Sequence, residues 1–213
     1  MIKIFGQKIQ MISFIKYNSI IPCTIVKIEK NRIINIEKKE KKNYVIFLGY
    51  KKIKKINKPL EGFFKKYKSK YYRKIIQLNN INIKEIKFLK KKFKKKYIDI
   101  NLFKKGEKID ITGYTIGKGF QGVVKRHKFS GVGESTHGQH NRLRSPGSIG
   151  AGSSPSRVFK GMKMAGRMGN KKRTIKNIEI LDIDLKEKIL LLKGSIMGKN
   201  NLNNFLIIKK KCI

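Results

Sequence analysis

One stretch of about sixty residues, Gly113 to Arg173, limits the possible folds of this chain most strongly. It holds 13 of the 19 glycines and few bulky apolar side chains, so it cannot bury enough apolar surface to offset the entropy of ordering its backbone. It also holds six of the eight arginines, all three histidines and a single acid, Glu134, and its net charge is 13 − 1 = +12. We therefore expect it to be disordered, or to be ordered by a polyanion.

The whole chain is strongly basic. It has 53 Lys and Arg against 13 Asp and Glu, a net charge of +40, and such a chain repels itself unless an anion neutralises it. Nucleic acid, an anionic membrane and an acidic protein are the candidate partners, and a field this large favours a polyphosphate. Because lysine, isoleucine and asparagine recur everywhere, as in "KKIKKINK", a lysine run says little, whereas the scarce arginines are informative.

Neither a membrane protein nor a secreted one is indicated. No apolar run approaches the length of a membrane span, and Gln7, Lys8 and Gln10 interrupt the N-terminal apolar stretch that a signal peptide would need. The two cysteines, Cys23 and Cys212, lie near opposite ends and are expected to be separate reduced thiols. We expect a cytosol-like compartment.

The flanks of the glycine-rich stretch have the pattern of β-strands. Short Ile/Val-rich runs bounded by charged or turn residues predict strands at residues 20–30, 43–50, 97–103, 107–113, 173–184, 188–194 and 204–210. Asp184 to Lys188 is the expected hairpin turn. Strands on both sides of an irregular segment favour a mainly β protein with one small closed barrel, because closure removes edge strands.

Residues 61–96 are expected to form a small mixed α/β insert. Ile83, Ile86, Leu89 and Phe93 recur at roughly helical spacing, and Lys90 to Lys96 would be a solvated or phosphate-facing surface. The predicted division of the chain is therefore a first barrel segment at 1–60, the insert at 61–96, a second barrel segment at 97–113, an extension at 114–173 and a third barrel segment at 174–213.

The stretch "GKGFQG", Gly117 to Gly122, matches the glycine pattern of a dinucleotide site and, with two following valines, that of a kinase loop. A dinucleotide site needs a helix after the glycines and an acid about 20 residues later. The β-branched, basic stretch that follows predicts no helix, and Glu134 comes too early. The other kinase motifs are missing, and Gly119 stands where a Walker loop needs Ser or Thr. A nucleotide enzyme is not expected.

The same stretch offers little other site chemistry. His137 and His140 are spaced as H-x-x-H, but no cysteine is near them in the sequence. Ser135 and Ser148 lie near histidines, yet no aspartate is there to orient one. We expect no metal, no cofactor, no small-molecule substrate and no catalytic residue.

Contact with RNA explains this residue composition better. Glycine lets a backbone approach phosphates and bases closely, and arginine binds phosphate with two parallel hydrogen bonds and stacks on bases. Phe120, Phe129 and Phe159 lie among the basic residues, where they would stack on unpaired bases or anchor the loop. The stretch is therefore expected to thread through RNA.

Long motifs in this stretch resemble the family of large ribosomal subunit protein three, of the bacterial type. The resemblance runs from about Asp110 to Gly198 and includes "GKGFQGVVKRH", "THG", "PGSIG", "PSRVFKGMKMAGRMGN" and "LLLKGS". Nearer the N-terminus, "IPCTIVKI" resembles the opening strand of the family and "KPLEGFF" its K-P-x-x-G-H-F, with Phe63 in place of histidine.

The resemblance implies a closed six-stranded, translation-protein-like barrel and an extension that reaches toward the peptidyl transferase centre. It implies a structural protein, not an enzyme, that binds large-subunit rRNA near its 3′ end and nucleates subunit assembly. Its neighbours would be large-subunit proteins fourteen and nineteen, with no membrane partner. The location would be a bacterial-type ribosome in the cytoplasm or in an organelle.

The resemblance also implies which residues contact RNA. The predicted rRNA-binding residues are Lys118, Lys125, Arg126, His127, His137, Arg142, Arg144, Arg157, Lys160, Lys163 and Arg167. The glycines expected to permit close approach to RNA are Gly117, Gly119, Gly122, Gly147 and Gly150.

Two other functions fit the composition less well. A non-ribosomal basic architectural protein would bind nucleic acid with little sequence preference, but it would not need so many glycines in one tract. A membrane-active basic protein needs an amphipathic apolar face, which residues 113–173 lack. The identity of the bound nucleic acid separates these alternatives.

Overall fold

The computed structural model of the chain describes residues 2–16, 18–39, 44–81, 97–135, 137–199 and 205–210. The chain forms two compact units. The first combines residues Met1–Tyr114 with Lys172–Ile213, and the second is Thr115–Lys171. Strands dominate, which confirms the prediction of a mainly β protein.

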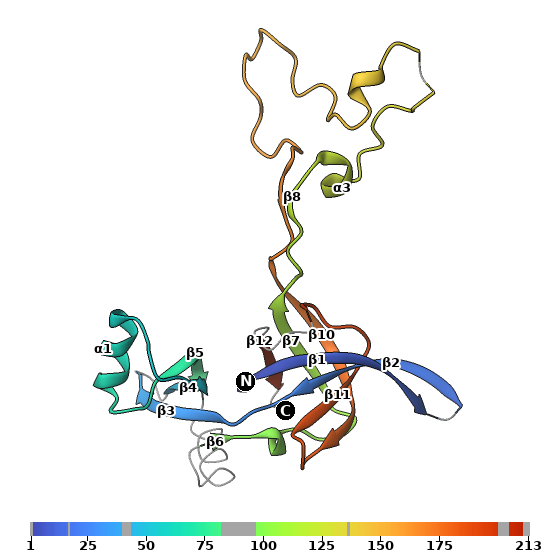
Figure 1. The fold of residues 1–213 in the computed structure, drawn as a ribbon. Coiled ribbons are helices and arrows are strands. Elements are labelled where there is room, and N and C mark those ends of the chain that lie inside the picture. Colours follow the sequence, from blue (N-terminus) through green and yellow to red (C-terminus); the bar gives the residue numbers. More distant parts are fainter. Residues whose placement is uncertain are drawn as a thin grey trace. The chain divides into compact units, whose positions relative to one another are not determined.

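Six strands of the first unit form one antiparallel sheet (Figure 1). They are β1 (Ile2–Lys16), β2 (Ser19–Lys27), β7 (Lys108–Tyr114), β10 (Lys172–Asp184), β11 (Ile189–Lys193) and β12 (Phe205–Lys210). Their order is β1-β12-β7-β10-β11-β2, and β2 pairs again with β1, so the order closes on itself. The segments before and after the second unit thus meet in the pair β7–β10.

Alternation along these strands separates an inner face from an outer one. Ile109 and Ile111 on β7 and Leu206 and Ile208 on β12 are fully buried. Thr112, which follows the buried Ile111 on β7, faces the other way and pairs with Thr174 of β10. A period of two places Ile and Leu on the inner face, and on the outer face of β7 the polar residues Asp110 and Thr112 are buried as well.

Four further strands of the same unit form a second sheet in the order β5-β4-β3-β6. They are β3 (Asn31–Lys38), β4 (Tyr44–Lys52), β5 (Tyr72–Ile81) and β6 (Tyr97–Ile98), and helix α1 (Lys58–Lys66) joins β4 to β5. Phe63 of α1 packs its ring against Phe47 of β4, with centroids 5.5 Å apart, and against Tyr67 at 4.8 Å. One hydrophobic core spans both sheets.

The expected barrel segment 1–60 is wrong in its second half, because β3 and β4 belong to the four-stranded sheet. Asn31 gives the physical reason. If β2 continued, Glu29 would pair with Phe5; instead the buried Asn31 side chain accepts from Phe5 N at 2.9 Å and donates to Phe5 O at 3.1 Å. A side chain therefore satisfies the edge of β1, and the main chain leaves the sheet.

The expected strand at 97–103 is also mostly wrong, and so is the second barrel segment before residue 108. Only Tyr97–Ile98 is a strand, and it pairs with β3 rather than with the six-stranded sheet. The side chain of Asp99 then accepts from Ile100 N at 2.9 Å and starts the 3₁₀ turn η1 (Ile100–Leu102). Local side-chain capping of this kind competes with strand pairing.

The mixed insert thus begins at Asn31, before the expected 61–96, and its described helix is α1. The helix expected from Ile83 to Phe93 and the lysine run Lys90 to Lys96 lie outside the described residues.

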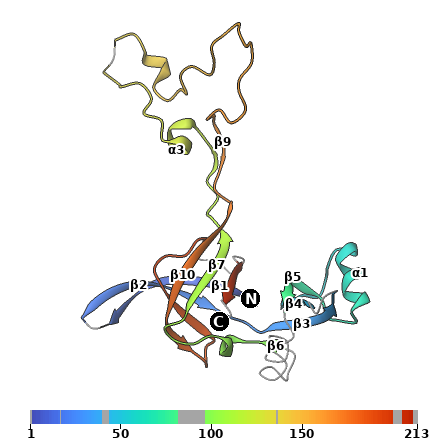
Figure 2. The same cartoon turned by 180° about the vertical axis from the view of Figure 1, so that it is seen from behind.

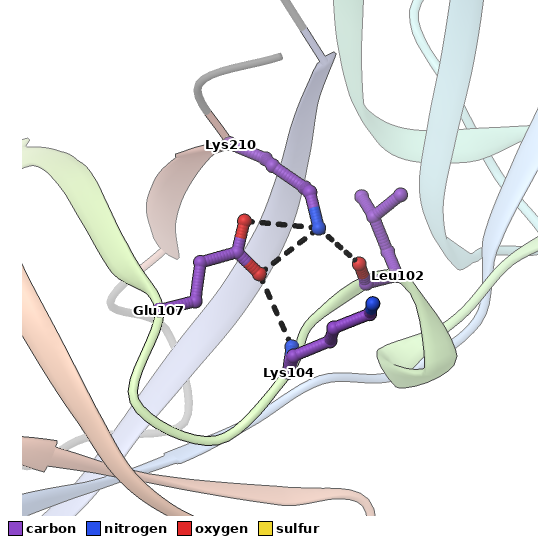
Figure 3. Close-up of polar contacts among 4 residues, drawn as sticks. All are labelled: Leu102, Lys104, Glu107 and Lys210. Atoms are coloured by element: carbon purple, nitrogen blue, oxygen red, sulfur yellow. Dashed lines mark hydrogen bonds and ion pairs between the residues drawn. The ribbon is translucent and has the colours of Figure 1, made fainter. Parts of the chain in front are cut away.

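A charged cluster fixes the last strand to the loop before β7 (Figure 3). Lys210 Nζ lies 2.9 Å from both carboxylate oxygens of Glu107 and donates to Leu102 O at 2.7 Å. Lys104 N donates to Glu107 Oε2 at 3.1 Å. Both charged side chains are only 19% exposed, so this ion pair is better shielded from water than a typical surface pair.

The second unit contains the strands β8 (Gly119–Gln121) and β9 (Gly166–Met168), which pair antiparallel, the helix α3 (Val123–His127) and the 3₁₀ turn η2 (His140–Arg142). Figure 2 shows the loops between them from behind. The expectation of no helix after the glycines is wrong, because α3 starts at Val123, directly after Gly122. In the described part of the chain, no helix is long and apolar enough to cross a membrane.

Candidate nucleic-acid interface

The two ends of the 115–171 unit run side by side as a narrow ribbon. Thr115 N donates to Lys171 O at 3.0 Å, and Lys171 N returns a bond to Thr115 Oγ1 at 3.1 Å. Lys118 N donates to Met168 O at 2.9 Å, just before the β8–β9 pair begins. Backbone hydrogen bonds therefore hold this region together although it has little apolar core.

Arg126 and His127 at the end of α3 hold the returning chain. Arg126 Nη1 donates to Met164 O at 2.6 Å, and His127 Nε2 donates to the same oxygen at 3.0 Å. Lys128 then adopts a left-handed conformation and ends the helix. These contacts across 37 and 38 residues explain why one helical turn persists where β-branched and basic residues predict none.

Farther along, residues 128–132 lie against 143–147. Val132 N donates to Leu143 O at 3.3 Å, and a Cβ on Gly131 would lie 2.1 Å from that oxygen. A pocket of about 440 Å³ lies between these segments, lined by Lys128, Phe129, Ser130, Gly131, Val132, Ser145, Pro146 and Gly147. Gly131 is thus needed for close packing, and sequence reasoning did not single it out.

Nine of the eleven predicted rRNA-binding residues are exposed to solvent, and no hydrogen bond or ion pair joins their side chains to another described residue. They are Lys118, Lys125, His137, Arg142, Arg144, Arg157, Lys160, Lys163 and Arg167. Arg126 and His127 are the half-buried exceptions. The structure therefore separates residues that shape the loop from residues that leave their donors free.

The predicted close-approach glycines line open space. A Cβ on Gly119, Gly122 or Gly147 would meet nothing within 4 Å, and one on Gly117 or Gly150 would make only ordinary contacts. Gly119 and Gly147 have φ of +71° and +77°, a conformation that side chains disfavour. Tight packing within the protein is found instead at Gly131 and at Gly169, where a Cβ would lie 2.1 Å from Ile116 O.

Two of the three phenylalanines face solvent. Phe120 is 76% exposed and Phe159 is 57% exposed, whereas Phe129 is half-buried with its ring 6.1 Å from that of His127. The guanidinium of Arg157 lies 5.6 Å from the ring centre of Phe159, within the range of a cation–π contact. Phe129 thus anchors the loop, while Phe120 and Phe159 present open ring faces.

The geometry offers no nucleotide fingerprint at the glycines. β8 has three residues and pairs antiparallel with β9, while a dinucleotide site needs a parallel βαβ unit. Within the described ranges, no three His, Cys, Asp or Glu side chains gather as a possible metal site. What this unit presents is a basic, glycine-rich surface in which Glu134 is the only acid.

The sequence profile described as "Ribosomal protein L3" matches residues 31–195. That range includes the four-stranded sheet, the whole 115–171 unit and the strands β10 and β11. The chain belongs to the ribosomal protein L3 family. The family resemblance seen in the sequence is thus confirmed. The matched range includes the glycine-rich, basic unit, which lies in the sequence between the paired strands β7 and β10.

Named relatives agree over nearly the whole chain. The chain is 39% identical to the large ribosomal subunit protein uL3 of Herpetosiphon aurantiacus, covering 93% of this chain and 92% of the relative. It is 38% identical to the uL3 of Thermobifida fusca, covering 92% and 90%. The protein named uL3c of Emiliania huxleyi is 46% identical, covering 92% and 93%.

Membership in this family establishes the general role. The protein is a structural constituent of the large ribosomal subunit and not an enzyme, and it works in the ribosome, in the cytoplasm or in an organelle. A large-subunit protein implies rRNA and ribosomal partners.

Proposed function

We propose that the 115–171 unit threads into large-subunit rRNA and binds it through its nine exposed basic residues. The observation that carries this proposal is the separation of roles within the unit. Main-chain bonds, Arg126 and His127 hold the loop, and the side chains of the other predicted residues form no hydrogen bond or ion pair with another described residue. Donors left free in a surface with one acid suit a partner rich in phosphate.

Specific segments of the unit have different roles in this proposal. The open glycines Gly117, Gly119, Gly122, Gly147 and Gly150 leave the backbone accessible to phosphate and base edges. Phe120 and Phe159 stack on unpaired bases, with Arg157 held beside the ring of Phe159. Arg126 and His127 preorganise the loop and contact RNA only with donors that Met164 O does not use.

The wider role follows from the family. In this proposal the six-stranded sheet works as a closed, translation-protein-like barrel at the outer face of the subunit. The extension, 114–173 in the sequence-based division, reaches toward the peptidyl transferase centre. The protein binds near the 3′ end of the rRNA, nucleates subunit assembly and lies beside large-subunit proteins fourteen and nineteen.

A charge-conserving variant tests the proposal. Arg144→Lys combined with Arg157→Lys keeps the net charge but removes two planar guanidinium groups. We expect affinity for a transcript of the 3′ region of the large-subunit rRNA to fall about tenfold, the loss of roughly one charge-assisted hydrogen bond. The matched control, Lys104→Arg with Lys186→Arg in exposed loops of the first unit, should leave affinity unchanged.

The partner is identified by sequencing the RNA crosslinked to residues 115–171. Crosslinks confined to the 3′ region of the large-subunit rRNA support the proposal. Equal binding to duplex DNA, or an affinity that Arg144→Lys with Arg157→Lys leaves unchanged, would favour the basic architectural protein instead.

A further inference from the structure

A second basic site lies in the first unit, which contains none of the predicted rRNA-binding residues. It is a pocket of about 450 Å³ on the outer face of the six-stranded sheet, over β1, β7, β10 and β12. Its lining residues are Lys3, Thr112, Lys172, Arg173, Thr174, Ile207 and Lys209. Four of these seven residues are cationic and none is acidic, and the volume lies in the range of ligand sites.

The strand register brings two of the lysines directly together. Lys3 of β1 pairs opposite Lys209 of β12, and like charges opposite each other in an antiparallel pair are unfavourable. Among the described residues, no acid forms an ion pair with either lysine. The next residue, Lys210, faces the other way and is neutralised by Glu107 (Figure 3). On its other side Lys209 pairs opposite Asp110 of β7, but this acid forms no ion pair with either lysine.

Two hydroxyl groups complete the pocket. Thr112 Oγ1 and Thr174 Oγ1 lie 2.8 Å apart, so one hydroxyl donates to the other and one hydroxyl hydrogen remains for a further acceptor. Thr112 is 4% exposed, which fixes this pair in the sheet. Asp110, the acid opposite Lys209, is buried, and its Oδ1 accepts from Asn177 N at 3.0 Å.

We propose that this pocket binds a phosphate group of the rRNA backbone, as a contact separate from the extension. Lys3, Lys209 and Lys172 supply the positive charge, and the Thr112–Thr174 pair supplies a fixed hydroxyl donor to a phosphate oxygen. A bound phosphate also removes the repulsion between the two opposed lysines. This inference rests on the proposed rRNA binding, and it adds the sheet to the RNA-binding surface.

The test is a double variant, Lys3→Gln with Lys209→Gln, measured against large-subunit rRNA over a range of salt concentrations. We expect the slope of log affinity against log salt to fall by about 2, one for each lysine removed. The control, Lys104→Gln with Lys186→Gln, changes the net charge equally at exposed loop positions of the same unit and should leave the slope nearly unchanged.

The melting temperature of the free double variant separates lost binding from misfolding. The two substitutions relieve the repulsion between Lys3 and Lys209 and lose the attraction of Lys209 to the opposite Asp110, so the melting temperature should stay within about 3 °C of the wild type. Weaker RNA binding together with a larger fall in the melting temperature would mean that the variant is misfolded. The single variants Lys3→Gln and Lys209→Gln then test the inference, because each should lower the slope of log affinity against log salt by about 1.

Each outcome bears on the inference. Equal slopes in the double variant and the control overturn it, as does a pocket that binds inorganic phosphate while the rRNA slope stays at the wild-type value. If wild-type protein does not bind rRNA at all, the proposed function itself fails. If Arg144→Lys with Arg157→Lys weakens binding and Lys3→Gln with Lys209→Gln does not, only this inference fails.

Discussion

At the scale of single residues, equal charges have unequal surroundings. Lys209 and Lys210 are adjacent, yet Lys210 bonds Glu107 and Leu102 O, while Lys209 lies between Lys3 on β1 and Asp110 on β7 and forms no ion pair with a described residue. Arg126 looks like its arginine neighbours in the sequence, but it binds Met164 O. The basic surface could be predicted from composition and from the positions of the arginines. The sequence could not predict which basic side chains bond within the protein, because partners such as Met164 O lie 38 residues away in the sequence.

Lys8 is the clearest case of a cation used within the protein. The residue is 6% exposed, and its ammonium donates to Ile196 O at 2.7 Å and to Gly198 O at 3.2 Å. We expect Lys8→Met to lower the free energy of unfolding by about 1–3 kcal/mol, because two carbonyls lose their donor. Lys108→Met, at an exposed end of β7, should change it little. Chemical denaturation of both variants is the measurement, and equal losses would contradict the argument.

The same lysine gives a pH test. Burial lowers the pKa of Lys8 in the folded protein below its ordinary value of 10.5. Between the folded-state pKa and 10.5, the unfolded chain therefore binds more protons than the folded one. The contribution of Lys8 to the free energy of unfolding of the wild type rises with pH across this window. The difference in unfolding free energy between wild type and Lys8→Met should widen as the pH approaches 10.5. A difference that narrows would mean that the ammonium is not desolvated.

At the scale of elements, apolar runs located strands but not their sheets. The expected strands at 107–113, 173–184, 188–194 and 204–210 correspond to β7, β10, β11 and β12. The run at 43–50 is a real strand, β4, in the other sheet, because the polar side chain of Asn31 ends the pairing with β1. Strand β1 was missed because its glutamines and lysines obscure the alternation, and β5 because Arg73 and Lys74 do the same.

The β8–β9 ribbon supports a prediction at this scale. Gly169 has φ of +76°, and a Cβ there would lie 2.1 Å from Ile116 O, so Gly169→Ala should open the ribbon. By hydrogen exchange in free protein, we expect the amides of Thr115 and Lys118 to exchange at least about tenfold faster, since the strain costs roughly 1–2 kcal/mol. Gly122→Ala, where a Cβ meets nothing within 4 Å, is the control.

The same experiment examines the rest of the unit. In the wild type, amides of β7 and β10 should be protected, and most amides between residues 128 and 165 should exchange freely until rRNA is added. Strong protection of that loop in free protein would mean that it is ordered by its own packing. The claim that RNA binding orders this loop would then be wrong.

At the scale of the whole molecule, charge and fold are distributed differently. The net charge of +40 covers both units, while the apolar core clusters found among the described residues lie in the first. The sheets supply stability, and the 115–171 unit supplies exposed donors on a backbone held by hydrogen bonds. A chain of this charge is compensated fully only in its complex, where RNA phosphates neutralise it.

Affinity for rRNA should therefore depend steeply on salt. If the protein neutralises about 6–10 phosphates, a range that includes its nine exposed predicted residues, the binding constant should fall by ~10³–10⁵ between 50 and 200 mM salt. Replacing Arg142, Arg144 and Lys160 together with glutamine removes three of these contacts and should lower the slope of log affinity against log salt by about 3. Filter binding with the large-subunit rRNA measures both slopes. A flat salt dependence in the wild type would contradict phosphate neutralisation as the source of affinity. An unchanged slope in the triple variant would place the contacts elsewhere than on the exposed residues of the extension.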